Sequence, residues 1–295
     1  MHFNYMDYIH CPVCGNQSKL KYKLKFNVYK CQQCGLYTSD AEFDLSFQSS
    51  LELESREIGL KKLRFENFEA IVKALKAFKG DETRNLKGLE IGSGNGWWLK
   101  VCQENNIGCI GIEPEKSHQV YHQKNGLNIH YGFYPDLNIE RAKGFDFIIF
   151  NDVFEHIKDL DKLLISLKKD LNDGGLLIIN LPMSDGFFYK TAQLLYKIGI
   201  KSFMDRLWQF NFHSPHMNYF NQNNLELLLT KRGFLKTANI NLKSLDISTS
   251  KERIKADKDV SKLKAMILAT GLRVLKPVIL ASPSDIRVFF FKNQL

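Results

Sequence analysis

The sequence lacks the features that mark membrane-spanning and secreted proteins. No uninterrupted apolar stretch approaches the roughly 18 residues that a membrane span requires, and the longest candidate, residues 265–281, is broken by Arg273 and Lys276. The first ten residues, MHFNYMDYIH, lack the basic head and apolar core of a signal peptide. Only seven prolines occur in 295 residues, and no segment is repetitive or of low complexity. We therefore expect a globular cytoplasmic protein with one domain of ordinary size and a small accessory unit.

Acidic residues are in deficit, because 32 Asp and Glu stand against 41 Lys and Arg, which gives a formal net charge of +9. Such an excess favours an anionic partner, whether nucleic acid, acidic lipid or charged glycan. Much of it falls in residues 251–276, which we interpret as a solvated helix face plus loop. A basic amphipathic helix over residues 255–280 that touches a membrane surface is the alternative, although packing on its own domain is favoured. The sequence gives no indication of the oligomeric state.

Cysteines are few, and four of the six lie in two pairs within the first 34 residues: Cys11, Cys14, Cys31 and Cys34. Each pair is separated by two residues and followed by a glycine, which permits the positive φ of a metal-binding knuckle. Without a secretory signal, paired cysteines indicate metal ligands rather than disulfides. A closed four-thiolate site has no open coordination position, so we predict a structural zinc ion.

This N-terminal unit is predicted to be a zinc ribbon over residues 1–45. Residues 19–30 alternate in polarity as a strand with a charged outer face would. A ribbon this short cannot bury a core of its own, so zinc must hold it together. Apolar residues at helical spacing over residues 61–78 predict a helix in a linker region, residues 46–85, and the main domain follows over residues 86–295.

A glycine-rich turn opens the main domain, where a short apolar strand leads into Gly92-Ser93-Gly94-Asn95-Gly96 and then a helix. A dinucleotide-binding G-x-G-x-x-G would need glycine at position 97, which Trp97 occupies. The acid Glu90 stands two residues before the first glycine. A carboxylate there suits an ammonium group better than a pyrophosphate, which it would repel.

Strands and helices then alternate, which predicts a parallel sheet with helices on both faces. The strand over residues 108–112 ends at Glu113, whose carboxylate can accept hydrogen bonds from ribose hydroxyls. Further strands are expected at residues 127–131, at the apolar run 145–150, which fits a strand buried on both faces, and within residues 173–182. Helices are expected around His118 and over residues 160–171.

Four motifs follow one another along this domain: E-I-G-S-G-N-G, the I-E-P strand end, F-D-x-I-x-x-x-D-V-x-E-H-I and G-G-x-L-x-I-x-x-P. In combination, these motifs resemble those of class I methyltransferases, particularly the ubiquinone-type branch. The resemblance covers residues 86–234, and residues 288–291 look like the family's closing antiparallel strand. It implies an α/β, Rossmann-like fold whose seven-stranded sheet is mostly parallel with an antiparallel last strand, and S-adenosylmethionine as cofactor.

The resemblance also implies roles for individual residues. Glu90, Gly92, Gly94 and Gly96 should border the methionine part of the cofactor, and Glu113 should hold the ribose. Asn151 and Asp152 should close the pocket. The family places an acid near the adenine after the third strand, but here Gly132 and Phe133 stand there, so we expect adenine contacts from backbone and aromatic stacking. Trp97 and Trp98 are interpreted as packing residues, with a pocket-facing tryptophan as the alternative.

Three histidines are candidates for the base that methyl transfer to a hydroxyl requires. His156 follows the fourth strand, at the edge of the sheet where such folds bind ligands. His216 matches an H-x-x-x-F segment of the related branch, and His213 is the weaker candidate beside it. The alternatives are a histidine that only shapes the pocket and loop histidines that order a lid. The aromatic insertion over residues 184–217 is predicted to cover the acceptor, with ordinary helix packing as the alternative.

The acceptor is expected to be a small molecule. The first choice for the methylated atom is an oxygen on a sugar, a glycan precursor or a lipid-linked intermediate. Carbon is a further option, because some ribbon-bearing relatives modify nucleotide-linked sugars. An RNA or protein methyltransferase is the runner-up. Nucleic acid is disfavoured because the D/N-P-P-Y/F-type motif of base-nitrogen methylation is absent. A non-catalytic module that binds S-adenosylmethionine and docks through the ribbon is the third hypothesis.

Overall fold

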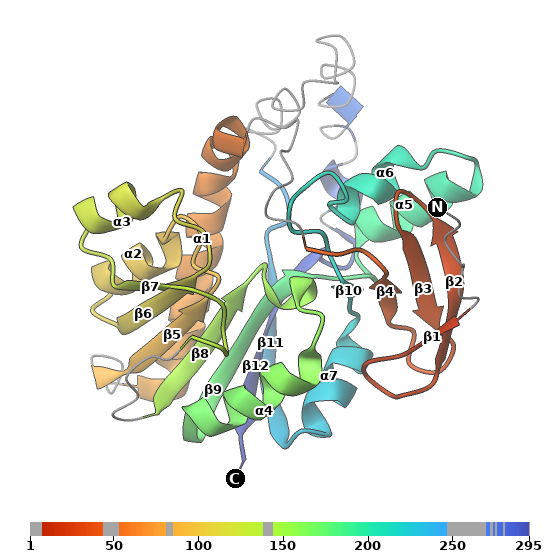
Figure 1. The fold of residues 1–295 in the computed structure, drawn as a ribbon. Coiled ribbons are helices and arrows are strands. Elements are labelled where there is room, and N and C mark those ends of the chain that lie inside the picture. The colour runs from red at the N-terminus through yellow and green to blue at the C-terminus, as the bar shows by residue number, and fades with distance from the viewer. Residues whose placement is uncertain are drawn as a thin grey trace.

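The computed structural model describes residues 8–43, 53–80, 85–137, 144–246, 270–271, 274, 276–279 and 281–294. Two β-sheets organise this part of the chain, one of seven strands and one of five (Figure 1). Most of the basic segment proposed to touch a membrane, residues 255–280, lies outside the described residues. Among those described, no helix combines the length and apolar character that crossing a membrane requires.

The larger sheet has the order β11-β12-β9-β8-β5-β6-β7. Its strands are β5 (Lys87–Ile91), β6 (Gly108–Glu113), β7 (Ile129–Tyr131), β8 (Phe145–Asn151), β9 (Leu171–Pro182), β11 (Phe234–Leu242) and β12 (Ile286–Asn293). Strands β7, β6, β5, β8 and β9 are parallel neighbours, whereas β12 runs antiparallel to both β9 and β11. The fold class predicted from the sequence is confirmed. The strand order reverses between β5 and β8, which in such sheets places the ligand crevice at their carboxyl ends.

Helices cover both faces of this sheet. The helices are α1 (Leu53–Lys79), α2 (Trp97–Glu104), α3 (Gln119–Lys124), α4 (Leu160–Asp170), α5 (Phe187–Lys197), α6 (Ser202–Leu207) and α7 (Gln222–Thr230), with a 3-10 turn, η2 (Phe154–His156). Helices α1 and α2 pack on the face that contains Phe147 and Ile149 of β8, and α4 and α7 pack on the face that contains Ile148 and Phe150. All four strand residues are fully buried, and burial of each such side chain contributes about 1.5–3 kcal/mol. The prediction that residues 145–150 form a strand buried on both faces is confirmed.

The smaller sheet is mostly formed by the N-terminal ribbon, and its order is β1-β2-β3-β4-β10. The strands are β1 (Tyr8–His10), β2 (Gln17–Lys23), β3 (Asn27–Cys31), β4 (Tyr37–Ser39) and β10 (Asn218–Tyr219). The single strand predicted over residues 19–30 is wrong, because β2 and β3 form an antiparallel hairpin that turns at Leu24–Phe26. No glycine or proline marks this turn, so the alternating pattern runs through it unbroken.

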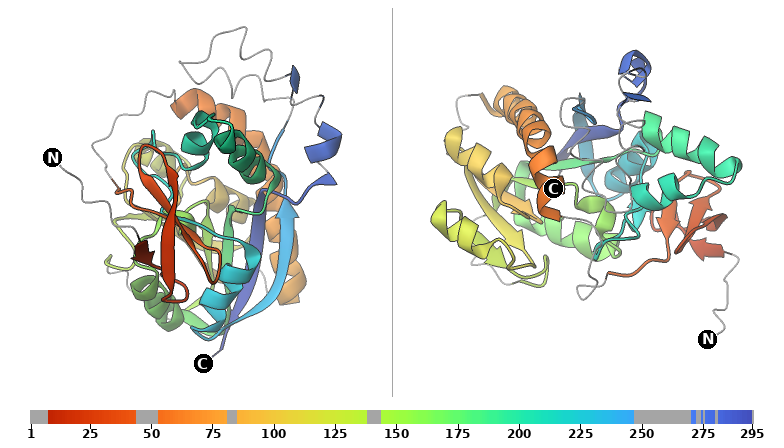
Figure 2. Two further views of the ribbon diagram at one scale, coloured as in Figure 1. Left: turned by 90° about the vertical axis from the view of Figure 1, so that its right-hand side faces the viewer. Right: turned by 90° about the horizontal axis from the view of Figure 1, so that it is seen from above.

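The ribbon shares a core with the insertion that was predicted to be a lid. Strand β4 pairs with β10, which lies about 180 residues later in the sequence, and Figure 2 shows the ribbon strands beside α5 and α6. Tyr22 and Tyr37 of the ribbon belong to one buried aromatic cluster with Tyr189, Trp208 and Tyr219. The ribbon is therefore packed directly on the larger domain, across the predicted boundary between them.

Candidate functional site

The glycine-rich turn joins β5 to α2 at the carboxyl edge of the larger sheet. Gly92, Gly94 and Gly96 all have positive φ, at 74°, 50° and 73°, a conformation that is strained for other residues. A Cβ on Gly92 would lie 2.5 Å from Val153, and one on Gly96 would lie 2.5 Å from Leu127, whereas a Cβ on Gly94 would meet no atom within 4 Å. Of the three, Gly94 is the glycine that borders open space.

That space is a hollow of about 110 Å³. It brings together four of the predicted cofactor residues with side chains from α1 and α2; the lining residues are Arg64, Phe68, Glu90, Gly92, Ser93, Gly94, Asn95, Trp97, Trp98 and Asn151. Trp98 is 1% exposed and packs against Phe68 and Phe147, as expected of a packing residue. Trp97 is only partly buried, and both indoles border the hollow.

Glu90 is the most deeply buried charged group of the hollow. Its side chain is 2% exposed, and its Oε1 accepts a hydrogen bond of 2.9 Å from the Asn151 amide, which is in turn contacted by Asn180 at 3.4 Å. Within the described part of the chain, Oε2 has no hydrogen-bond partner. Burial raises the pKa of Glu90 to about 8. An ammonium group in the hollow would supply the missing donor and favour the carboxylate, which fits the methionine end of S-adenosylmethionine.

Glu113 closes the end of β6 and is tied to the glycine turn. The Gly94 N–H donates to its Oε2 at 2.7 Å, and the Glu115 N–H donates to its Oε1 at 2.9 Å. Burial raises the pKa of this carboxyl. Each carboxylate oxygen has a second lone pair, so the group can accept further hydrogen bonds from a ribose. Its predicted role is compatible with this geometry and stays a prediction.

Two residues that bear on the turn were missed in the sequence. Arg64 of α1 lines the hollow, and its guanidinium lies 3.0 Å from the Asp152 carboxylate, with both side chains about one-third exposed. Asp152 therefore lies at the rim of the hollow, beside Asn151. His122 of α3 is buried, and its ring nitrogens lie 2.9 Å from the Gly94 carbonyl and 2.8 Å from the Tyr131 hydroxyl. Burial lowers the pKa of His122, so a neutral ring donates to Gly94 and braces the turn.

The predicted adenine side lies beyond Glu113. The Gly132 N–H donates to the Glu113 carbonyl at 3.0 Å, and the Phe133 side chain is 51% exposed. His213 lies on this side too, with its Nε2 2.7 Å from Glu115 Oε1. This contact raises the pKa of His213 and lowers that of Glu115. Contacts of Gly132 and Phe133 with adenine stay a prediction.

The structure brings two of the three candidate histidines together. The rings of His156 and His216 have centroids 4.7 Å apart, and Glu155 Oε1 lies 4.0 Å and 3.9 Å from their Nε2 atoms. Glu155 is fully buried, and burial raises its pKa well above the usual range. The His216 side chain is 4% exposed and that of His156 is 15% exposed, so His216 is the more deeply buried of the two, whereas His213 is not part of this group. One ligand atom from each of Glu155, His156 and His216 lies within 4.8 Å of the other two. The cluster can therefore share a proton, and it also has the composition of a cation site with two histidines and one carboxylate.

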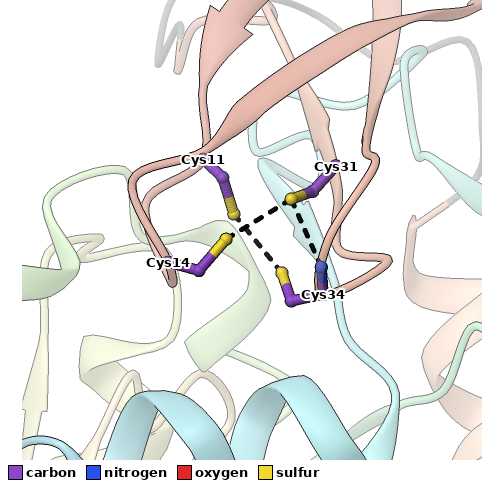
Figure 3. Close-up of side chains that lie close together, drawn as sticks. All are labelled: Cys11, Cys14, Cys31 and Cys34. Carbon is purple, nitrogen blue, oxygen red and sulfur yellow. Dashed lines mark hydrogen bonds between the residues drawn. The ribbon is translucent and has the colours of Figure 1, made fainter.

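The four N-terminal cysteines converge on one point (Figure 3). Their ligand atoms lie within 4.8 Å of one another, with Sγ atoms 3.5 Å apart for Cys11 and Cys34 and 3.4 Å apart for Cys14 and Cys31. These separations are far longer than the roughly 2.05 Å of a disulfide, and near the ~3.8 Å between thiolates in a tetrahedral zinc site with bonds of ~2.3 Å. Gly15 and Gly35 have φ of 76° and 73°, as predicted for the knuckles.

The sheet order, the glycine turn at its switch point and the buried acid behind that turn define a class I nucleotide-binding methyltransferase fold. A family model described as a methyltransferase domain matches residues 62–238. The chain belongs to this family, and its main domain is a class I S-adenosylmethionine-dependent methyltransferase domain.

Curated relatives match over a shorter stretch. The ubiquinone biosynthesis O-methyltransferase of Rickettsia prowazekii is 26% identical over 125 residues, covering 41% of this chain and 49% of that protein. The protein of the same name from Pelagibacter ubique is 28% identical over 116 residues, covering 38% and 48%. The chain thus spans about half the length of these relatives. Among solved structures, a SAM-dependent methyltransferase from Thermotoga maritima is 15% identical with a TM-score of 0.51, covering 82% of this chain and 94% of that one, a likeness that shows the fold alone.

Proposed function

We propose that this chain transfers the methyl group of S-adenosylmethionine to a hydroxyl oxygen of a small-molecule acceptor. Methyl transfer is an in-line displacement, so the protein must align donor and acceptor and, for a hydroxyl, remove a proton. The observation that carries the proposal is the position of His156 in η2, four residues beyond Asp152 at the rim of the cofactor hollow and five beyond Asn151, which lines it.

The contacts of His156 suit a base. Its Nδ1 lies 2.9 Å from the Pro215 carbonyl oxygen, which can only accept, so Nδ1 carries the proton. In the neutral ring Nε2 then holds the lone pair. Burial raises the pKa of the Glu155 carboxyl beside Nε2 well above its usual range, so a neutral Glu155 would not hold His156 as the imidazolium before the acceptor proton arrives. His216 is more deeply buried than His156, and its ring packs against that of His156, so it would position His156 rather than touch the acceptor.

The acceptor class that the surface favours is a lipid-linked intermediate, with a sugar or glycan precursor as the next choice. The end of α5, the start of α6 and the turn between them expose four large apolar side chains: Leu194, Ile198, Ile200 and Phe203, between 42% and 67% exposed. Lys197 and Lys201 lie among them and are exposed as well. Apolar groups interleaved with lysine are the composition that binds the headgroup region of a lipid surface.

We further propose that the cysteine cluster holds a structural zinc ion. Cys11, Cys14, Cys31 and Cys34 would bind it as thiolates, and the ion would supply the cross-link that stabilises the ribbon. The separations of the sulfur atoms and the positive φ of both knuckle glycines support this assignment. Because thiolate sites of this kind persist in reducing compartments, we keep the cytoplasm as the proposed location.

The test is transfer of labelled methyl from S-adenosylmethionine into separate lipid, polar-metabolite and RNA fractions, with the product identified by mass. We expect a labelled lipid or polar product from the wild type. His156→Asn, which keeps a donor for Pro215 but removes the base, should lower turnover by about 10²–10⁴-fold while affinity for S-adenosylhomocysteine is unchanged. Label in RNA or protein would favour the polymer alternative, and binding without any product would favour the non-catalytic module.

A further inference from the structure

The segment that leaves the ribbon, residues 41–43, reaches the carboxyl edge of the larger sheet, and we call it the ribbon arm. Ala41 is buried in the aromatic core that the ribbon shares with the insertion. The Glu42 carboxylate lies 3.8 Å from the Lys158 ammonium, two residues beyond His156. The arm therefore lies close to the edge where the cofactor residues gather, although it precedes β5 by more than 40 residues in the sequence.

Three rings from three separate segments meet at the arm. The Phe43 ring contacts Phe133 edge to face, with centroids 5.9 Å apart, and contacts His213 edge to face at 6.1 Å. Phe133 follows β7, and His213 belongs to the insertion. Phe43 is 39% exposed and Phe133 is 51% exposed, so ring surface at this edge is available to a flat ligand.

The same rings are linked to the carboxylate that is predicted to hold the ribose. His213 pairs with Glu115 at 2.7 Å, and the Glu115 N–H donates to Glu113 Oε1. Phe133 follows Gly132, whose N–H donates to the Glu113 carbonyl. The other carboxylate oxygen of Glu113 faces the glycine turn, where it accepts from Gly94. In an adenosyl cofactor with its methionine end at the glycine turn, the base must extend from the ribose toward the side of Glu115 and Phe133.

We propose that Phe43 of the ribbon arm, together with Phe133 and His213, encloses the adenine ring of the cofactor. The N-terminal ribbon would then supply part of the cofactor pocket of the methyltransferase domain. Adenine has two apolar faces that stack on aromatic side chains, and a phenyl ring stands where the family's acid would otherwise contact the base. This inference rests on the proposed binding of S-adenosylmethionine.

The test compares two ligands that differ only in the base. S-adenosylhomocysteine contains adenine, whereas S-ribosylhomocysteine keeps the homocysteine and the ribose but lacks it. Phe43→Ala in the full chain should raise the Kd for S-adenosylhomocysteine by about 5- to 150-fold, the range of aromatic stacking on one base, and leave the Kd for S-ribosylhomocysteine unchanged. Phe43→Tyr should bind both ligands as the wild type does.

The matched control is Tyr8→Ala, which removes a ribbon aromatic of similar exposure, 47%, whose ring contacts His10 within the ribbon. It should leave both constants unchanged, and unchanged melting temperatures would show that the ribbon is intact in each variant. If Phe43→Ala weakens the binding of both ligands equally, or weakens the binding of neither, the assignment of Phe43 is overturned while the proposed function stands. A wild type that binds no S-adenosylhomocysteine would instead refute the proposed function and this inference with it.

Discussion

Replacement of Glu90 by Gln tests the chemistry of the hollow, because the pKa of Glu90 is raised by burial to about 8. At pH 7 the folded protein without ligand therefore holds this carboxyl mainly protonated, whereas an ammonium ligand binds the ionised form. The ionised fraction grows from about one-eleventh at pH 7 to about one-half at pH 8. Binding of S-adenosylhomocysteine should accordingly tighten about fivefold between these pH values and about tenfold per unit below pH 7.

Calorimetry in two buffers of different ionisation enthalpy measures the proton released on binding. We expect nearly one proton at pH 7 from the wild type and none from Glu90→Gln. The Gln variant should also bind about 10- to 150-fold more weakly at pH 8, because a neutral amide replaces a charge-assisted partner worth roughly 1.5–3 kcal/mol. Glu104→Gln, on an exposed position of α2, is the matched control and should behave as the wild type. A Gln variant that keeps wild-type affinity at pH 8, or no proton release from the wild type, would refute the reasoning.

The same shift has a consequence for stability. The pKa of Glu90 is higher in the folded protein than its unfolded value near 4.5. At pH values between these two pKa values, the native state therefore binds more protons than the unfolded state. The stability of the ligand-free protein should therefore fall as the pH rises from about 4.5 to 8. Saturating S-adenosylhomocysteine should reduce this slope, which thermal unfolding across that range would measure.

Three further predictions concern the turn, its brace and the metal. Gly94→Ala should weaken S-adenosylhomocysteine binding at least tenfold, because the added Cβ would enter the hollow. The control Gly126→Ala has φ of 63° and equally open surroundings, so it should lower stability by a similar amount, about 1 kcal/mol, without loss of affinity. Equal affinities of these two variants for S-adenosylhomocysteine would contradict the placement of the ligand. His122→Phe should loosen the turn and raise the same Kd several-fold, while His130→Phe, on β7, should not; titration calorimetry decides both. Chelation should release one zinc per chain by colorimetric assay and lower the melting temperature, and a chain that releases no metal would exclude the structural zinc.

The sequence predicted the larger sheet well because its signals are local. The apolar run at residues 145–150, the glycine turn and the carboxylate at the end of β6 each follow from a short stretch of chain. The structure places Glu90, Gly92, Gly94 and Asn151 around one hollow. The cysteine cluster was equally predictable, because two C-x-x-C pairs set their own spacing. These features depend little on long-range packing.

What the sequence could not indicate depends on contacts between distant segments. Arg64 was hidden in a helix that was interpreted by its apolar face, and only the docking of α1 beside β8 brings its guanidinium to Asp152. The ribbon was treated as separate, but its tyrosines pack on α5 and Trp208, and β4 pairs with β10. The hairpin at Leu24–Phe26 was missed because its turn carries no glycine or proline.

The most direct test of the central claim is equilibrium binding of labelled S-adenosylmethionine to the full-length chain at pH 8, with unlabelled S-adenosylhomocysteine as competitor. The structure predicts saturable binding of one cofactor per chain, fully displaced by the competitor and strongly weakened by Glu90→Gln. A folded wild-type chain that shows no saturable binding would contradict the claim that the hollow behind the glycine turn is a cofactor site.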